Sequence, residues 1–287
     1  MNNKILLLGA SGYIGKVFKE KLPEDNFVTM KHEDISVSNL LNETCKNRFD
    51  TIINCCGYVG RPNVDVVERH KEEAVYGNII IPDILVQFAN IVKEITILHI
   101  SSGCIFRGDE NQVFSETDSP NLDWNSQSSC SFYGGSKSMS EKIISRYPNH
   151  YICRLRMPFD HEENERNYLS KLLKYDKLLS LPNSLSHRYD FVDACIQLLE
   201  KECEFGTYNI TNTGFITAKE ICEIFRNEFD FKNDFKFYDD IEDFLISTGC
   251  YPRSNCVLSN DKLTKAGIKM RGIREAITES ISNYPRG

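Results

Sequence analysis

The sequence feature that most constrains the fold is a glycine-rich turn near the N-terminus. The apolar run Lys4–Leu8 leads directly into Gly9–Gly15, and a helical pattern continues to about Leu22. A strand, a tight glycine turn and a helix in this order let the backbone approach a pyrophosphate, whose charge then lies at the helix N-terminus. This context predicts a dinucleotide site and argues against a glycine-rich turn without a ligand. The predicted cofactor contacts are Gly9, Ser11, Gly12, Tyr13, Ile14 and Gly15.

Predicted strands and helices alternate through the first half of the chain. Short apolar runs predict strands at Lys4–Leu8, Phe27–Met30, Thr51–Asn54, Ile95–Ile100 and His150–Arg154. Helical patterns occupy about Asp65–Val92, where Pro82 predicts a break or kink, and Ser131–Arg146. This alternation predicts an α/β fold with a doubly wound parallel sheet, the Rossmann architecture.

The alternation weakens after Arg156-Met157-Pro158. Helical patterns follow at 164–175 and 217–229, and short strand patterns lie near 208–210 and 235–238. We therefore expect residues 1–156 to form a cofactor-binding domain and residues 157–287 to form a smaller α+β lobe that binds the substrate. A helix at about 190–203 is expected to return to the first domain.

Composition excludes several classes of protein. A chain of 287 residues suits one large α/β domain or two linked lobes. Its net charge of −7 gives no electrostatic support for binding nucleic acid or a membrane surface. We expect no membrane-spanning run and no signal peptide, hence a cytoplasmic protein. The eleven cysteines are scattered without zinc-like spacing, which predicts free thiols and no metal site.

A second group of residues indicates chemistry on a carbonyl. Tyr133 and Lys137 have the spacing that puts two side chains on one side of a helix, one turn apart. The lysine charge is expected to lower the tyrosine pKa and to prepare the phenol for proton transfer to a carbonyl. Ser102, after the strand Ile95–Ile100, could share the carbonyl oxygen. Cys104 adds an ionisable thiol that a plain reductase does not need, unless it is only a small core side chain.

The residues after the second predicted strand bear on the choice of cofactor. An acidic residue there would bind the ribose hydroxyls of NAD, whereas Lys31 and His32 come first and could meet a 2′-phosphate. We therefore favour NADP, with NAD left open. Asp34 and Ile35 are expected to border the adenine. The segment after the third strand should pass beneath the cofactor, with contacts from Asn54, Cys55 and Gly57.

Together these motifs resemble the extended short-chain dehydrogenase/reductase superfamily. Within it, the chain is similar to the UDP-4-keto-6-deoxyglucose 3,5-epimerase/4-reductases of plants and giant DNA viruses. The matching segments are Gly60–Asp65, Gly103–Phe106, Ser131–Tyr133, Arg154–Pro158, Leu181–Ser184 and Pro252–Asn255. Two departures are Val66, where the family usually has tryptophan, and Gly134-Gly135 after the tyrosine, in place of Ser-Lys.

The resemblance implies a role for each catalytic candidate. Tyr133 would be the acid/base for reduction, Lys137 would hold the nicotinamide ribose and Ser102 would orient the carbonyl. Cys104 and Lys171 would be the two acid/base groups of the epimerisation, since a nearby cation can lower a thiol pKa and burial can lower a lysine pKa. The family also implies a homodimer.

The resemblance further implies where cofactor and substrate bind. Met157 would contact the cofactor, and Arg253 would clamp the diphosphate, because guanidinium binds phosphate oxygens in bidentate fashion. The remaining expected substrate contacts are Arg61, Asn63, Asn167, Asn183 and Asn255.

The implied activity is the conversion of UDP-4-keto-6-deoxy-D-glucose to UDP-L-rhamnose with NADPH. Three alternatives stay open at this point. The first is the same chemistry on a dTDP- or GDP-linked sugar, and the second is a 4-reductase in which Cys104 is structural. The third is a non-catalytic, NADP-binding regulatory subunit, which the complete set Ser102, Tyr133 and Lys137 disfavours.

Overall fold

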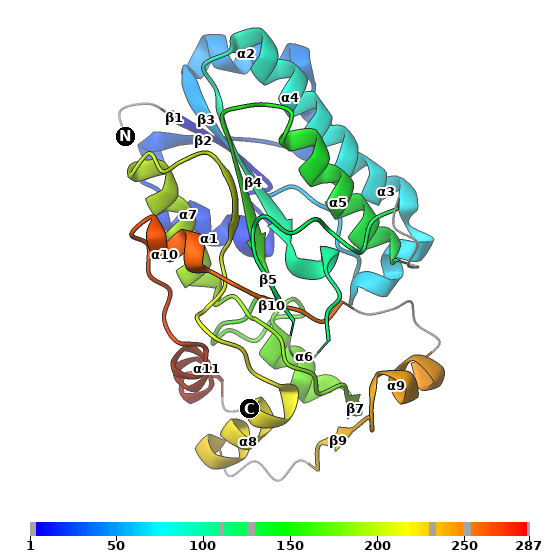
Figure 1. The fold of residues 1–287 in the computed structure, drawn as a ribbon. Helices are drawn as coiled ribbons and strands as arrows, with labels where there is room; N and C mark the ends of the chain where they lie inside the picture. The colour runs from blue at the N-terminus through cyan, green and yellow to red at the C-terminus, as the bar shows by residue number, and fades with distance from the viewer. Residues whose placement is uncertain (1–3, 110–111, 125–129, 230–233, 249–253, 286–287) are drawn as a thin grey trace.

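A computed structural model describes residues 4–109, 112–124, 130–229, 234–248 and 254–285 (Figure 1). Its centre is a parallel sheet with the strand order β2-β1-β3-β4-β6-β8. The strands are β1 (Lys4–Leu8), β2 (Phe27–Met30), β3 (Phe49–Asn54), β4 (Thr96–Ser102), β6 (His150–Leu155) and β8 (Gly206–Asn209). The five strands expected in the first half of the chain are thus confirmed, as is the doubly wound α/β architecture.

Side chains that alternate along each strand supply two cores, one on each face of the sheet. In β1, Ile5 and Leu7 point to one face and Leu6 and Leu8 to the other, and all four are buried. Such strands, apolar on both faces, read as continuous hydrophobic runs, and this is why β1 was recognisable in the sequence.

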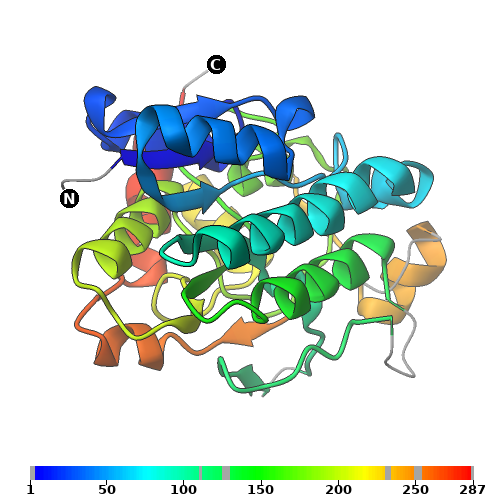
Figure 2. The same cartoon turned by 90° about the horizontal axis from the view of Figure 1, so that it is seen from above.

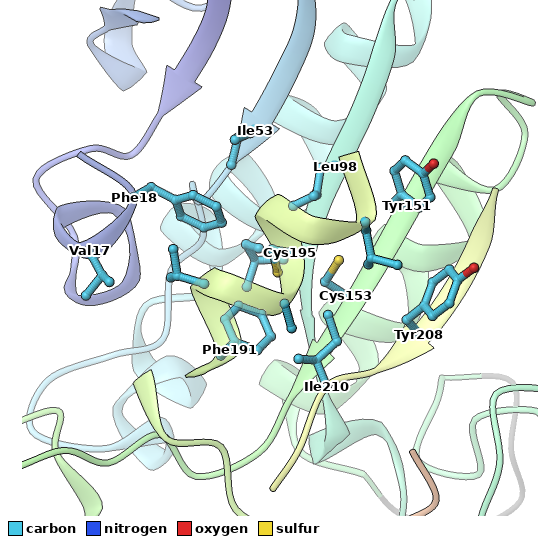
Figure 3. Packing of buried hydrophobic residues seen from close by; sticks show 14 of the residues in the cluster. Val17, Phe18, Ile53, Leu98, Tyr151, Cys153, Phe191, Cys195, Tyr208 and Ile210 are labelled. Atoms are coloured by element: carbon cyan, nitrogen blue, oxygen red, sulfur yellow. The ribbon is translucent and has the colours of Figure 1, made fainter. Parts of the chain in front are cut away.

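Helices cover both faces. The first face carries α1 (Tyr13–Lys21) and α7 (Arg188–Glu200), and Figure 3 shows Phe18 and Phe191 from these helices packed over the strands. The second face carries α2 (Val37–Asn47), α4 (Ile81–Val92) and α5 (Phe132–Ile144), and Figure 2 shows α4 and α5 side by side.

The strand order places a crevice at the carboxyl end of β1. The chain leaves β1 through α1 to reach β2 at the edge, and it then crosses back through α2 to β3 on the other side of β1. Ligands of open parallel sheets bind where the winding direction reverses in this way. The predicted glycine turn, Gly9–Gly15, lies at this reversal point.

The long helix before β4 continues through Pro82 instead of breaking there. It comprises α3 (Lys71–Val75), the π-helical turn η4 (Tyr76–Ile80) and α4. The wider turn directly before Pro82 accommodates a residue that lacks an amide hydrogen.

By length and composition alone, Lys71–Val92 could cross a membrane, with a mean hydropathy of 1.5, contrary to our expectation that no such run exists. Its inner residues, among them Leu85 and Phe88, are buried against the sheet. The core helix of a soluble protein passes the same test.

The rest of the chain builds a second lobe with its own core. This core joins α6 (Tyr168–Lys174), α8 (Ala218–Phe229) and α11 (Ile273–Ser282). Two short strand pairs complete this part of the structure: β5 (Val113–Phe114), which precedes β6 in the chain, pairs with β10 (Val257–Leu258), and β7 (Lys177–Leu178) pairs with β9 (Lys236–Phe237). Two further helices are α9 (Ile241–Thr248) and α10 (Asp261–Lys265). The chain returns to the main sheet with strand β8 as well as with the expected helix, α7.

The glycine pair after Tyr133 has a packing reason. A Cβ atom on Gly135 would lie 2.0 Å from Nε1 of Trp124, whose indole also contacts Phe132 with ring centroids 5.0 Å apart. Only glycine lets the indole lie this close to α5.

We expect Gly135→Ala to displace Trp124, at a cost of about 1–3 kcal/mol for overpacking. This exceeds the gain of about 1 kcal/mol in helix propensity. Trp124 is the only tryptophan in the chain, so its emission maximum and the thermal unfolding curve report both effects. Gly272→Ala, where nothing lies within 4 Å of an added Cβ, is the control. Unchanged emission and stability in Gly135→Ala would contradict the packing argument.

Candidate active site

The glycine turn forms a close-fitting cradle at the end of β1. Gly9 has φ +72°, and an added Cβ would lie 2.7 Å from the main chain of Cys55. A Cβ on Gly15 would lie 2.1 Å from the carbonyl oxygen of Gly9. Gly12 caps α1 without a side chain, and the first turn of the helix carries no acidic residue. The exposed main chain at Ser11 and Gly12 can therefore approach a pyrophosphate closely, which is the fit that a dinucleotide requires.

The residues after β2 lie on one side of this cradle. Lys31 and Asp34 are exposed and line a surface hollow between β2 and α2. His32 is paired with Glu33, with 2.9 Å between Nδ1 and the carboxylate. Ile35 is buried in the core beneath α2, so its contact with adenine stays a prediction.

The loop after β3 is linked to α5, the helix that carries Tyr133 and Lys137, by the buried side-chain amide of one asparagine. Asn78, in η4, accepts a hydrogen bond from the amide of Tyr58 at 2.9 Å and donates to its carbonyl at 3.0 Å. Its amide nitrogen also donates to Ser136 in α5, at 2.9 Å. A Cβ on Gly57 would come within 3.1 Å of the Asn78 side-chain oxygen. The loop expected beneath the cofactor is therefore held against η4 and α5, and Asn78 was not recognised in the sequence.

The two cysteines of this loop are packing residues. Burial raises the pKa of Cys55 well above its ordinary value and raises that of Cys56 to about 12. The side chain of Asn54 is fully buried, and its oxygen accepts a hydrogen bond from the amide of Cys56 at 3.0 Å. The Asn54 side chain thus fixes the main-chain conformation at the start of this loop.

Ser102 and Tyr133 meet at the carboxyl end of β4. Both side chains are buried, and the Ser102 hydroxyl accepts a hydrogen bond from the amide of Cys104 at 3.2 Å. Burial raises the pKa of Tyr133 and the nearby Cys104 raises it further, while a hydrogen bond with Ser102 lowers it. The structure therefore reverses one expectation: the phenol is held in its protonated form.

Lys137 lies one turn further along α5, as the spacing predicted. Its ammonium donates to the carbonyl oxygen of Ile100 at 2.8 Å and lies 3.5 Å from Nε2 of His99. Burial lowers the pKa of Lys137 to about 8, against the opposing charge of Glu141. His99 is itself buried, bonded to Ser140 at 2.7 Å, and burial holds its pKa well below the ordinary value. A neutral histidine thus borders the lysine, a contact that the sequence did not reveal.

Cys104 lies in the short 3-10 turn η5 (Gly103–Ile105), directly after Ser102. Its sulfur accepts a hydrogen bond from Nη1 of Arg156 at 3.1 Å. Arg156, which follows β6, also donates through Nη2 to the side-chain oxygen of Asn183 at 2.6 Å. The sequence placed Arg156 only within a matching segment and gave it no role.

Lys171 lies in α6 and is half-buried. The helix begins at Tyr168, later than the expected residue 164, because Asn167 caps it and accepts a hydrogen bond from the amide of Leu169. The Asn167 amide nitrogen donates to the main-chain oxygen of Asp160 at 2.8 Å. Asn167 therefore orients α6 and with it Lys171, whose position opposite Cys104 across a sugar stays a prediction.

The segment after Gly60 meets a loop of the second lobe. Arg166 donates through Nη1 to the carbonyl oxygen of Gly60 at 2.6 Å, and Arg61 pairs with Glu165 at 3.3 Å. Asn63 caps the 3-10 turn η3 (Val64–Arg69). The charge of Arg166 acts to lower the pKa of Tyr133, so this arginine also belongs to the site. The sequence around Arg166 does not indicate that this residue lies near the tyrosine.

Two of the residues expected near the nucleotide make hydrogen bonds within the protein. Asn183 accepts from Arg156 and from the amide of Cys256 at 3.1 Å. Asn255 donates to the carbonyl oxygen of Gly108 at 2.7 Å. Both side chains therefore hold loops of the site, and their contact with a nucleotide stays a prediction. Arg253 lies outside the described residues, and Met157 is half-buried with φ +37°.

The fold is similar to those of solved nucleotide-sugar enzymes. The structure matches that of a UDP-rhamnose synthase from Acanthamoeba polyphaga mimivirus with a TM-score of 0.85 at 24% identity, covering 98% of this chain and 99% of that one. It matches a dTDP-4-dehydrorhamnose reductase from Bacillus anthracis, in complex with NADP, with a TM-score of 0.79 at 18% identity, covering 99% and 98%. At these identities the likeness shows the fold.

Two relatives from Arabidopsis thaliana match nearly all of this chain. A bifunctional dTDP-4-dehydrorhamnose 3,5-epimerase/dTDP-4-dehydrorhamnose reductase is 29% identical over 288 residues, covering 96% of this chain and 91% of the relative. A trifunctional UDP-glucose 4,6-dehydratase/UDP-4-keto-6-deoxy-D-glucose 3,5-epimerase/UDP-4-keto-L-rhamnose-reductase is 28% identical over 289 residues, 96% of this chain, which spans only 41% of that relative's length. A family model described as the RmlD substrate binding domain matches residues 3–286, and on this evidence the chain belongs to that family.

Proposed function

We propose that the protein is a bifunctional 3,5-epimerase/4-reductase that converts UDP-4-keto-6-deoxy-D-glucose to UDP-L-rhamnose with NADPH. The observation that carries the proposal is the position of Cys104. Its sulfur lies in the turn after Ser102, is bonded by Arg156 and is close enough to raise the pKa of Tyr133. A reductase alone needs the serine, the tyrosine and Lys137 but no ionisable thiol beside them.

The glycine cradle fits NADPH. Gly9, Gly12 and Gly15 would admit the pyrophosphate, and Lys31 would meet the 2′-phosphate, which is the basis for preferring NADP to NAD. When bound, the nicotinamide supplies the hydride that reduces the sugar ketone at C4. Lys137 would hold the adjacent ribose.

Protonation at the C4 oxygen is the task of Tyr133. Because its pKa is raised, the phenol carries its proton at neutral pH and can give it up as negative charge develops on the oxygen. Ser102 would share the same oxygen through its hydroxyl. A reductase needs this tyrosine as a proton donor, so the raised pKa of Tyr133, which keeps the phenol protonated, suits reduction.

Epimerisation would use two groups on opposite faces of the sugar. The C4 ketone acidifies the protons on C3 and C5, since the carbanion delocalises into an enolate. We assign one face to Cys104 and the other to Lys171. The donor to the Cys104 sulfur, Arg156, is a cation, and cations favour the thiolate form that abstracts protons.

The nucleotide is the least constrained part of the proposal. We assign the diphosphate to Arg253 and the neighbourhood of the nucleotide to Asn183 and Asn255. One plant relative is named for a dTDP-linked sugar and another for a UDP-linked sugar, so dTDP is the main alternative and GDP the next. Initial rates of NADPH oxidation with the three nucleotide sugars would decide among them, and a UDP rate below the others would overturn the choice.

Product analysis by NMR in deuterated water tests both activities at once. Without NADPH, we expect deuterium to enter C3 and C5 of UDP-4-keto-6-deoxyglucose. With NADPH, we expect UDP-L-rhamnose deuterated at both carbons. NADPH oxidation without deuterium at either carbon would leave a 4-reductase alone. Absence of any turnover would instead support a cofactor-binding regulatory protein.

We further propose that the enzyme is a homodimer in the cytoplasm. Ile80 and Ile91 are large apolar side chains that are 42% and 58% exposed on the helix beside α5. Covering this face with a second copy would bury them. The cysteines within the described residues are free thiols, as suits a reducing compartment. Light scattering would measure the mass in solution.

A further inference from the structure

Arg156 differs from the other buried arginines in what it binds. Arg154 is paired with the carboxylate of Glu141 at 2.7 Å, and Arg188 with that of Asp160 at 2.5 Å. Desolvating a guanidinium is costly, and these two carboxylates compensate for it.

The side-chain hydrogen bonds of Arg156 go to other kinds of group. Within the described residues, its guanidinium donates to the Cys104 sulfur at 3.1 Å, the Asn183 side-chain oxygen at 2.6 Å and the Ser254 carbonyl oxygen at 2.6 Å. Of these three acceptors, only the thiol can become an anion. The other titratable groups that the structure describes around the sulfur are Tyr133, Lys137 and Cys256, and burial raises the pKa of the Tyr133 phenol and of the Cys256 thiol, which keeps both neutral. Arg156 is 3% exposed, so water contributes little to its solvation. A thiolate at position 104 would thus supply the negative charge that Glu141 and Asp160 supply to the other two arginines.

The guanidinium is also held firmly. The amide of Arg156 donates to the Ser186 hydroxyl at 3.0 Å, and its carbonyl oxygen accepts from the Ser186 amide at 2.7 Å. Its Nη2 is anchored by Asn183 and Ser254 on the second lobe, which leaves Nη1 directed at the sulfur. In the parallel pairing of β4 with β6, Ser102 lies opposite Leu155. The segments that follow these two residues carry Cys104 and Arg156, so both side chains lie at the carboxyl edge of the sheet.

We propose that Arg156 is a positioning residue that holds the side chain of Cys104 and stabilises its thiolate, so that epimerisation depends on Arg156 through Cys104. The inference deepens the proposed function and rests on it. The guanidinium remains bonded to the sulfur when the thiolate takes a proton from carbon and becomes a thiol. Hydride transfer to C4 involves Ser102 and Tyr133 and requires no change of charge at the sulfur.

Alkylation of Cys104 tests the contact independently of any sugar. Iodoacetamide reacts with the thiolate, so the rate at each pH reports its population. With the NADP-bound protein and peptide mass spectrometry, we expect the Cys104 profile to move to higher pH in Arg156→Met than in the wild type, with Arg156→Lys between. The exposed Cys45 serves as an internal standard whose profile should not move.

Arg156→Lys, which keeps a cation but loses the planar guanidinium, keeps the test decisive if Arg156→Met does not fold. A Cys104 profile that is unchanged in either folded variant would overturn the proposal.

Deuterium exchange then connects the contact to catalysis. A charge-assisted hydrogen bond of this kind corresponds to about 10- to 100-fold in rate. We expect Arg156→Met to slow deuterium entry into the substrate by that factor, and to slow reduction of an already epimerised 4-keto sugar much less. Equal losses in both reactions would indicate a general structural role and overturn the proposal. Absence of exchange in the wild type would refute the proposed function, while the alkylation profiles would still decide whether Arg156 stabilises the thiolate.

Discussion

Replacing Tyr133 with phenylalanine is expected to lower kcat for NADPH oxidation by about 10²–10⁴-fold, the usual contribution of a positioned general acid. The ring is buried against the turn that carries Cys104 and remains accommodated without its hydroxyl. NADPH binding, followed by the fluorescence of the reduced nicotinamide, should persist.

Tyr208→Phe is the matched control for this substitution. The Tyr208 hydroxyl donates to the carbonyl oxygen of Glu204 at 2.7 Å and has no part in the proposed chemistry. A Tyr133→Phe protein with the same kcat as Tyr208→Phe would remove Tyr133 from the proton transfer. Because Tyr133 holds its proton, the wild-type rate should not fall through ionisation of this group as pH rises from neutral to mildly alkaline values.

Replacing Cys104 with alanine is expected to separate the two activities. Deuterium entry at the carbon that Cys104 serves should fall by about 10²–10⁴-fold, since the variant lacks the group that moves the proton. Reduction of a supplied 4-keto sugar with the L-rhamno configuration should continue, because Ser102, Tyr133 and Lys137 are intact. NMR of the substrate in deuterated water measures the first reaction, and absorbance of NADPH measures the second.

Cys45→Ala is the control for the loss of a thiol, since Cys45 is exposed in α2 and has no part in the proposed chemistry. If Cys104→Ala exchanged deuterium at both C3 and C5 at the rate of Cys45→Ala, the thiol would be structural. Groups other than Cys104 would then carry the proton transfers of the epimerisation.

The parts of the fold that the sequence predicted are those with a local signal. The central strands of the main sheet were recognisable because strands buried on both faces are largely apolar, and the turn after β1 was recognisable by its glycines. The edge strand β2 is only half-buried and has a weaker signal. The continuity of the helix through Pro82 was not predictable, because a π-helical turn depends on the packing around it.

The parts of the site that the sequence missed depend on contacts between distant residues. Arg156 and Cys104 are 52 positions apart, and only the pairing of β4 with β6 brings them together. An arginine after a strand is ordinarily a surface residue, so nothing local distinguishes this one. The asparagines expected at the substrate rest on resemblance, and their contact with a substrate stays a prediction; the structure shows that Asn167 and Asn183 fill internal hydrogen-bonding roles that a motif does not reveal.

The three hydrogen bonds of Asn78 have a mechanical consequence. One amide group joins the loop at Tyr58, the π-helical turn and Ser136 in the catalytic helix. The loop proposed to lie beneath the nicotinamide and the helix that carries Tyr133 are thereby joined through a single side chain. A displacement of the loop is therefore coupled to a displacement of α5, which would keep the spacing between a bound nicotinamide and the Tyr133 hydroxyl constant.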